Sequence, residues 1–177
     1  MSNPHIFRRG LRFSVVTLLL WPAFCVPITS SASPNTRVAD HILILKSAHT
    51  MTLMNGKDVL KTYKVALGIE PVGAKTRTGD HKTPEGIYTV DAKNAHSHFH
   101  WALHLSYPNA SDRARARQLG VSPGSDVEIH GLEDKYAWIG AAHRQTDWTD
   151  GCIAVTNSEI EEIWPLVAVG TIVEIRP

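Results

Sequence analysis

The chain has 177 residues, and its 18 Lys and Arg residues against 17 Asp and Glu residues give a formal net charge of +1. Because the charge is almost balanced, the composition argues against nucleic acid or an anionic membrane surface as a partner. Once the export segment described next is removed, roughly 145 residues are left, which is the size of one domain with a substantial hydrophobic core.

The N-terminal segment, residues 1–32, has the three parts of a secretory signal peptide. A positively charged start is followed by an apolar stretch over 13–26 and then by small residues, with Ala32 as the last residue before the predicted cut. The apolar stretch is too short and too interrupted for a stable membrane span. We therefore predict cleavage after Ala32, a short linker over 33–40 and one domain over 41–177, with a retained N-terminal anchor as the alternative. The positive charges are Arg8, Arg9 and Arg12.

The chain has two cysteines, and the predicted cleavage removes Cys25. Cys152 is then the only thiol of an exported protein, with no intramolecular partner for a disulfide. Such a thiol is buried and inert, paired between chains, or reactive. The glycine and polar residues around Cys152, in "DWTDGCIAVTN", favour a reactive thiol, because structural cysteines usually lie among apolar residues.

Most of the predicted domain has the residue patterns of β-strands. Short aliphatic, alternating or β-branched segments recur, and Asn55-Gly56 between two extended segments is a strong hairpin signal. The predicted strands are "HILILK" at 41–46, the segments on both sides of Asn55-Gly56, "TPEGIYTVD" at 83–91, "WALHLSY" at 101–107, "DVEIHG" at 126–131 and the closing "TIVEIRP". We predict a mainly β domain with a few short helices.

Two short helices are predicted. The first covers 111–119, with Ser111 as its capping residue and a glycine after its last turn. The second begins at Thr156, because Thr156 and Glu159 have the spacing of a capping box, and Pro165 ends it early. The second helix therefore starts directly after the cysteine loop.

A thiol is a nucleophile only as a thiolate, which needs a nearby imidazole, positive group or helix N-terminus. The loop of Cys152 precedes the second predicted helix and lies near the positive end of its dipole. Gly151 lets the backbone turn neighbouring amides toward an oxyanion. Two imidazoles are candidate bases, His130 at the end of a predicted strand and His143 in a polar loop. We favour His130, because a rigid element holds a side chain more accurately than a loop.

Three segments, "TPEGIYTV", "EIHG" and "TDGCIAVTN", resemble in their order the catalytic domain of the L,D-transpeptidases, the exported cysteine enzymes that act on bacterial peptidoglycan. The resemblance covers nearly the whole predicted mature chain, since the first predicted hairpin also resembles the opening strands of that domain. It implies a β-sandwich or barrel fold, a periplasmic location of the Gram-negative type, and no metal or organic cofactor.

Carried over residue by residue, the resemblance implies that Cys152 is the acyl-accepting nucleophile. It implies that His130 is the base that activates the thiol and the acid that protonates the leaving amine. The implied substrate is a peptidoglycan stem peptide, attacked at the amide carbonyl that follows a meso-diaminopimelate centre. The implied supporting residues are Gly131, Thr149, Asp150, Gly151 and Asn157.

Two positions depart from the family pattern. Asp150 stands where the family usually has His, and Ala154 stands where it commonly has Arg. A carboxylate beside the nucleophile by itself raises the pKa of the Cys152 thiol, and we hypothesise that Asp150 orients an imidazole or a substrate ammonium. The variant motif resembles a short proteobacterial branch that includes hydrolytic members. The acceptor is therefore open: an amine of a second stem or of an outer-membrane lipoprotein makes a transpeptidase, and water makes a hydrolase.

The sequence can also be tested for two other classes of function, a wall-binding module and a zinc-binding protein. A non-catalytic wall-binding module is expected to lose Cys152 or His130, and both are present. A zinc-binding protein would use the histidines of "HSHFHWALH", the first three of which share one face of an extended strand. A polar, solvent-facing strand is favoured instead, because no acidic or Cys ligand accompanies them in the sequence. These histidines are His96, His98, His100 and His104.

A charged segment and two tryptophans each have a functional and a structural interpretation. The segment "KTRTGDHKTPEG" contains Lys75, Arg77, His81 and Lys82, which either bind the carboxylates of stem peptides or form an ordinary charged loop. The tryptophans that flank the His143 loop either line a binding cleft or cap the core. These tryptophans are Trp138 and Trp148.

Overall fold

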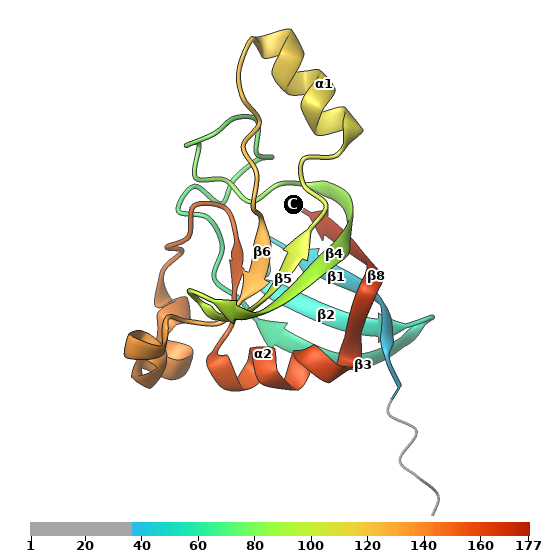
Figure 1. Ribbon diagram of the computed structural model, residues 1–177, viewed down its shortest axis with the longest axis vertical. Helices are drawn as coiled ribbons and strands as arrows, with labels where there is room; N and C mark the ends of the chain where they lie inside the picture. Colours follow the sequence, from blue (N-terminus) through green and yellow to red (C-terminus); the bar gives the residue numbers. More distant parts are fainter. Residues whose placement is uncertain (1–36) are drawn as a thin grey trace, which may run out of the picture. The chain divides into compact units, whose positions relative to one another are not determined.

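The computed structural model describes residues 37–177, drawn as the coloured ribbon of Figure 1. The predicted signal peptide, its cleavage site and Cys25 lie outside the described residues. Within the described part, no helix has both the length and the apolar character that crossing a membrane requires.

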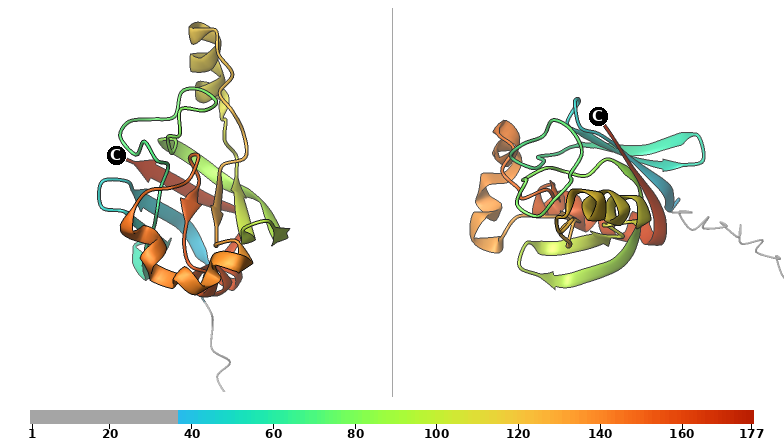
Figure 2. Two further views of the ribbon diagram at one scale, coloured as in Figure 1. Left: turned by 90° about the vertical axis from the view of Figure 1, so that its left-hand side faces the viewer. Right: turned by 90° about the horizontal axis from the view of Figure 1, so that it is seen from above.

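The domain is built on one curled sheet of eight strands (Figures 1 and 2). Across the sheet the strand order is β3-β2-β1-β8-β4-β5-β6-β7. The strands are β1 (Ala39–Leu45), β2 (Thr50–Asn55), β3 (Asp58–Lys64), β4 (Gly86–Ser97), β5 (His100–Leu105), β6 (Glu128–His130), β7 (Ile153–Ala154) and β8 (Val167–Arg176). The prediction of a mainly β domain is confirmed, and the curled sheet is closer to a barrel than to a two-sheet sandwich.

The first and last strands pair in the middle of the sheet. β1 is parallel to β8 and antiparallel to β2. β2 and β3 form the hairpin predicted at Asn55-Gly56, with Gly56 at a φ of 59° in the two-residue loop, where glycine is favoured. Because β1 begins at Ala39, the last two residues of the predicted 33–40 linker belong to the sheet.

β4 is the strand that connects the two halves of the sheet. Its first residues pair with β8, and its residues from Val90 onward pair with β5. The register shifts between Val90 and Ala92, and such an irregularity bends a strand. The bend curls the sheet around the core. The largest fully buried side chains are Tyr88, Ile42, Ile44, Met51, Leu53, Leu67, Leu103, Leu105, Ile129, Ile153, Ile160 and Ile163.

Helix α1 (Ala110–Leu119) begins one residue earlier than predicted and has a different cap. Asn109 Oδ1 accepts from the Ser111 and Asp112 amides, and the Asp112 carboxylate accepts from the Asn109 amide in return. The assignment of Ser111 as the capping residue is therefore wrong, because Asn109 already satisfies the free amides of the first turn.

Helix α2 (Asn157–Ile163) follows the cysteine loop as predicted (Figure 1). Thr156 caps it, and Thr156 and Glu159 make the reciprocal hydrogen bonds of a capping box. A short 3₁₀ turn, η2 (Trp164–Leu166), contains Pro165 and ends the helix. Ile160 and Ile163 are fully buried, so packing against the core fixes where the cysteine loop meets the helix.

One helical segment has no counterpart in the sequence analysis. The 3₁₀ segment η1 (Asp134–Gln145) includes His143, which we had placed in a polar loop. Gly140 interrupts it with a φ of 52° and a ψ of −136°, so η1 is two short turns joined at a kink. Neither turn is long enough to produce a helical repeat of apolar residues.

Candidate active site

Cys152 lies in a tight loop directly before β7 and faces a cavity of about 560 Å³. Thr149 shapes this loop, because its Oγ1 donates to the Cys152 carbonyl oxygen at 2.8 Å and accepts from the Gly151 amide at 3.1 Å. A Cβ at Gly151 would lie 2.5 Å from the Lys82 carbonyl oxygen, and Gly151 has a φ of 129°. Only glycine fits here. The cavity is lined by Lys75, Thr78, Gly79, His81, Ser122, Gly124, Ser125, Asp126, Val127, Asp150, Gly151 and Cys152.

The environment of Cys152 favours the neutral thiol. Burial raises its pKa to about 11, and the negative charges of Glu128 and Asp150 act in the same direction. Lys75 acts in the opposite direction but does not reverse the shift. The Cys152 Sγ atom donates to the Asp126 carbonyl oxygen at 3.5 Å. At neutral pH a nucleophilic role for Cys152 therefore requires a base.

His130 is held on β6 in a form that can accept a proton. It is only 1% exposed, stacks on Phe99 with ring centroids 4.4 Å apart and meets Trp148 edge-on at 6.0 Å. Burial lowers its pKa to about 4, so the ring is neutral at pH 7. The Nδ1 atom lies 2.6 Å from the Gly131 carbonyl oxygen. A carbonyl can only accept, so Nδ1 carries the proton and Nε2 has the free lone pair.

The register of β6 and β7 relates His130 to Cys152. The strands run parallel, with Ile129 beside Ile153 and His130 beside Ala154. His130 is therefore level with the second residue after Cys152, in the strand that directly follows the cysteine loop. Among residues 37–177, the thiol has no recorded hydrogen bond to an imidazole. The role of His130 as the base therefore stays a prediction.

His143 is less suited to be the base. Its Nε2 atom lies 3.3 Å from Arg144 Nε, and its Nδ1 atom lies 3.4 Å from Trp148 Nε1. Both ring nitrogens face these donors, and neither is directed at Cys152. Burial, with the nearby Arg144 charge, lowers the pKa of His143 to about 4. These contacts agree with the preference for His130.

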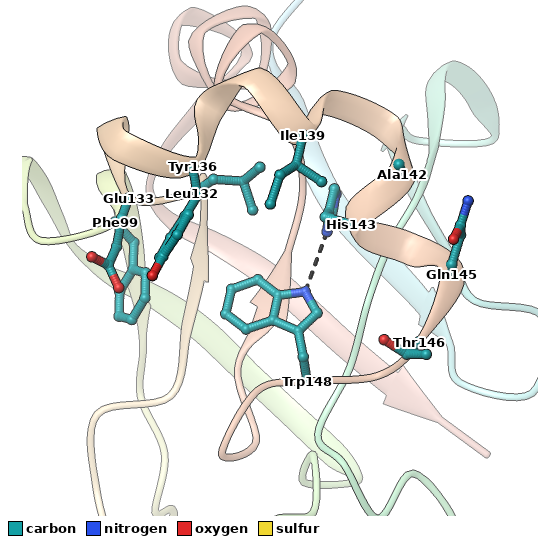
Figure 3. A pocket seen from close by; sticks show the side chains of 10 residues that line it. All are labelled: Phe99, Leu132, Glu133, Tyr136, Ile139, Ala142, His143, Gln145, Thr146 and Trp148. Atoms are coloured by element: carbon teal, nitrogen blue, oxygen red, sulfur yellow. Dashed lines mark hydrogen bonds between the residues drawn. The ribbon is translucent and has the colours of Figure 1, made fainter.

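A second cavity, of about 440 Å³, lies beside His143 (Figure 3). Trp148 and Phe99, the two rings that contact His130, are part of its wall. Trp138 is not part of that wall and is 83% exposed. Of the two tryptophans, Trp148 is the one that lines this cavity.

Gly131 and Asn157 fix the backbone after His130 rather than facing the cavity of Cys152. Asn157 Oδ1 accepts from the Leu132 amide at 2.6 Å. A Cβ at Gly131 would lie 2.7 Å from that same Asn157 oxygen and 3.2 Å from the Phe99 carbonyl oxygen. Together the two residues hold the Gly131 carbonyl where it meets the His130 ring.

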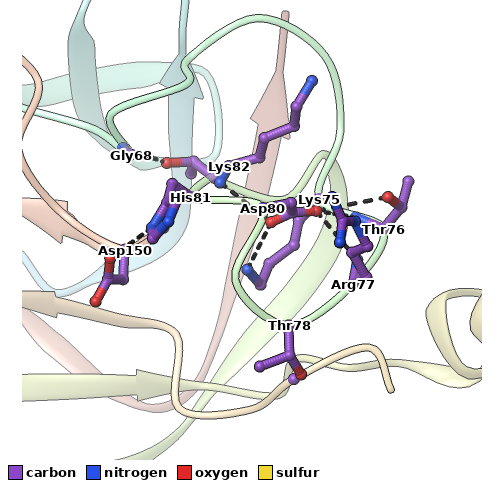
Figure 4. A network of polar contacts seen from close by, with 12 residues as sticks. Gly68, Lys75, Thr76, Arg77, Thr78, Asp80, His81, Lys82 and Asp150 are labelled. Carbon is purple, nitrogen blue, oxygen red and sulfur yellow. Dashed lines mark hydrogen bonds and ion pairs between the residues drawn. The ribbon is translucent and has the colours of Figure 1, made fainter. Parts of the chain in front are cut away.

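The segment over residues 75–82 is an ordered wall of the cavity (Figure 4). Lys75 is buried and its Nζ lies 2.8 Å from Asp80 Oδ1. The Asp80 carboxylate also accepts from the Thr76, Arg77 and Lys82 amides. Burial tends to raise the pKa of Asp80, but these donors outweigh it and lower the pKa to about 2. Hydrogen bonds to Asp80 thus fix the conformation of this segment, and its binding of stem-peptide carboxylates stays a prediction.

The histidine-rich segment is not a single strand. β4 ends at Ser97 and β5 begins at His100, so the segment turns back on itself. The prediction that His96, His98 and His100 share one face is wrong for that reason. Within the described residues, no group of three or more His, Cys, Asp or Glu side chains is placed to hold a metal ion. The recorded pairs are His98 with Glu133, His100 with Asp134 and Glu161, and His104 with Asp91 and Asp126.

Comparison with known proteins shows which family the chain belongs to. The sequence profile of the YkuD L,D-transpeptidase catalytic domain matches residues 39–175. This chain belongs to the L,D-transpeptidase family. YafK of Escherichia coli (strain K12), whose name assigns it to the L,D-transpeptidases, is 32% identical over 133 residues, which cover 72% of this chain and 46% of YafK. The chain thus spans about half the length of that relative.

Solved structures show the same fold. The helical cell shape determining protein Pgp2 from Campylobacter jejuni superposes with a TM-score of 0.61 at 24% identity, covering 78% of this chain and 47% of Pgp2. The L,D-transpeptidase (residues 123–326) from Xylanimonas cellulosilytica gives a TM-score of 0.54 at 17% identity, covering 81% of this chain and 63% of that one. These likenesses establish the fold of the L,D-transpeptidase domain.

The structure shows the contacts of Ala154 and Asp150, the two positions that depart from the family pattern. Ala154 is fully buried in β7 and pairs with Ala66 through two backbone hydrogen bonds. Asp150 Oδ1 lies 2.7 Å from His81 Nδ1 (Figure 4). The L,D-transpeptidase domain therefore brings an imidazole to Asp150 from 69 residues earlier in the chain, a partner that no local pattern indicates.

Proposed function

We propose that this L,D-transpeptidase-family chain is an exported, periplasmic cysteine enzyme of peptidoglycan metabolism, which forms a thioester between Cys152 and a stem peptide. The observation that carries the proposal is the combination of Cys152 on a rigid loop with His130 on the neighbouring strand. His130 is neutral and keeps its Nε2 lone pair free.

The first half-reaction is thioester formation. The Cys152 sulfur attacks the amide carbonyl carbon that follows a meso-diaminopimelate centre, while His130 Nε2 takes the thiol proton. The thiol pKa is about 11 and the imidazole pKa is about 4, so the ion pair is not formed in the free enzyme. Proton transfer therefore accompanies the attack, in the manner of general base catalysis.

The tetrahedral intermediate needs donors for its oxyanion. The Gly151 amide already donates to Thr149 Oγ1, so it does not also serve the oxyanion while that bond is intact. Of the amides around Gly151 that we expected to face the oxyanion, the Gly151 amide is therefore occupied. Collapse of the intermediate breaks the C–N bond, and the His130 imidazolium gives its proton to the departing amine.

The second half-reaction passes the acyl group to an acceptor. An amine from another stem or from an outer-membrane lipoprotein gives transpeptidation. Water gives the alternative, an L,D-carboxypeptidase or an amidase that releases lipoprotein or crosslinked peptide from the wall. The cavity at Cys152 has both charged and apolar lining residues, which suits a peptide substrate. The further alternative is a non-catalytic wall-binding module.

The test uses the purified chain and Cys152→Ala with two substrates, muropeptides with tetrapeptide stems and tripeptide stems linked to lipoprotein. Products are read by mass spectrometry. Crosslinked or exchanged stems that disappear in Cys152→Ala establish a transpeptidase, and released peptides alone establish a hydrolase. The absence of any Cys152-dependent product on these substrates would overturn the enzymatic proposal.

A further inference from the structure

A second imidazole lies in the cavity of Cys152. His81 and Asp150 both line that cavity, and His81 Nδ1 lies 2.7 Å from Asp150 Oδ1. His81 is on the loop that forms one wall, whereas His130 is buried on the sheet. His81 thus lines the same cavity as Cys152, and the proposed chemistry has used only His130.

The backbone holds His81 in an unusual conformation. Its φ is 53°, a left-handed conformation that is uncommon for residues other than glycine and requires support from its surroundings. Contacts of the His81 carbonyl and of the preceding residue give that support. The His81 carbonyl oxygen accepts from the Glu70 amide at 3.1 Å and lies against Gly68, where a Cβ would overlap it. The preceding residue, Asp80, is the carboxylate that anchors the loop.

The contact with Asp150 sets the tautomer of His81. A carboxylate only accepts, so Nδ1 of the neutral ring carries the proton and Nε2 keeps its lone pair. An imidazole oriented by an aspartate in this way is the arrangement that general base catalysis uses. The other charged groups along this cavity are Lys75 and Asp126, with Asp80 directly behind Lys75.

We propose that His81, oriented by Asp150, is the general base for the acceptor in the second half-reaction. This inference rests on the proposed thioester at Cys152. His81 Nε2 takes a proton from the attacking water or amine as the new bond to the acyl carbon forms. The C–S bond then breaks, and the His81 imidazolium gives the proton from the acceptor to the departing Cys152 sulfur. Asp150 is a positioning residue in this step, which accounts for an aspartate where the family usually has histidine.

The test separates formation of the thioester from its breakdown. His81→Gly suits the φ of 53° and removes the imidazole, and Asp150→Asn removes the orienting charge. The matched control is His49→Gly, because His49 also has a positive φ, 49°, and also pairs with an aspartate, Asp147, at 2.9 Å. His49 does not line the cavity. Each full chain is mixed with a tetrapeptide-stem muropeptide, with and without a second stem as amine, and the Cys152 adduct is followed by intact mass.

We expect adduct formation at the wild-type rate in His81→Gly, followed by breakdown that is slower by about 100-fold or more, so that the adduct accumulates. Asp150→Asn should slow breakdown to a smaller degree, and added imidazole should speed breakdown in His81→Gly but not in the control. Wild-type breakdown in His81→Gly, or equal slowing of both steps, would overturn the inference while the thioester still forms. If wild-type protein turns over stems without any Cys152 dependence, the proposed function fails instead.

Discussion

Two regions flank Cys152, and they hold their polar groups in opposite ways. On the sheet side, His130 is fixed by packing between Phe99 and Trp148 and has one recorded hydrogen bond, to Gly131. On the loop side, the 75–82 segment is fixed by hydrogen bonds to Asp80, and its His81 is 46% exposed at the side chain. Packing ties the sheet side to the stability of the core, whereas the stability of the loop side depends on an ionised carboxylate and therefore on pH.

The largest effect should come from the sheet side. We expect His130→Gln to lower turnover of stem peptides by about 10²- to 10⁴-fold, the range for loss of a general base. His143→Gln is the matched control, because it alters another buried imidazole whose nitrogens face Arg144 and Trp148. Steady-state rates on the same muropeptide give the comparison. A larger loss in His143→Gln than in His130→Gln would reverse the assignment of the base.

The next largest effect should come from Gly151, the residue at which the cysteine loop meets the 75–82 segment. Gly151→Ala forces a Cβ against the Lys82 carbonyl oxygen at a φ of 129°, so we expect a loss of about 2–4 kcal/mol in unfolding free energy together with most of the activity. Gly56→Ala has positive φ but open space and should cost about 1–2 kcal/mol with activity retained. Urea unfolding measures both. Equal losses in the two variants would show that the close approach to Lys82 is unimportant.

The loop side should show a pH dependence. The pKa of Asp80 is about 2 in the folded protein against 3.8 as the reference value, so its stabilisation is complete above pH 4 and is lost as pH falls toward 2. The shift corresponds to about 2 kcal/mol. Asp80→Asn should remove that part of the pH dependence, and Asp58→Asn, at an exposed pair with Arg37, should leave it in place. Unfolding curves from pH 5 to 2 for the three proteins provide the test, and parallel curves for wild type and Asp80→Asn would refute it.

The smallest effect should lie away from both regions, at the start of α1. Asn109→Ala removes the cap that accepts from two amides and should cost about 1 kcal/mol of stability without changing activity. Ser111→Ala, the residue that the sequence pattern selects as the cap, should be close to neutral. Thermal unfolding of the two variants gives the comparison, and a larger loss at Ser111 would contradict the observed capping.

Local signals in the sequence predicted the elements whose causes are local. The hairpin at Asn55-Gly56 depends on adjacent residues, and so does the capping box of Thr156 and Glu159, and both are present. η1 was missed because Gly140 divides it into turns too short for a periodic pattern. The histidine-rich segment was taken for one strand because its turn lacks the glycine or proline that marks most turns.

The same distinction applies to the candidate site. Thr149 and Gly151 act within four residues of Cys152, and the motif around the cysteine indicated both. The sequence suggested an imidazole as a partner of Asp150 but did not identify His81, and it did not indicate the contact of Asp80 with the buried Lys75. The first contact joins residues far apart in the chain, and the second depends on a burial that only the folded domain creates.

The position of β8 has a consequence for how the chain matures. β1 and β4 do not pair with each other, and β8 lies between them. Residues 167–176 therefore link β1 to β3 with β4 to β7 in the sheet, in addition to the isolated bridge between Ala66 and Ala154. Contacts between such distant parts of a chain form slowly. The pairing of β8 with β1 joins the two ends of the described chain, so we expect the centre of the sheet to be completed late in folding.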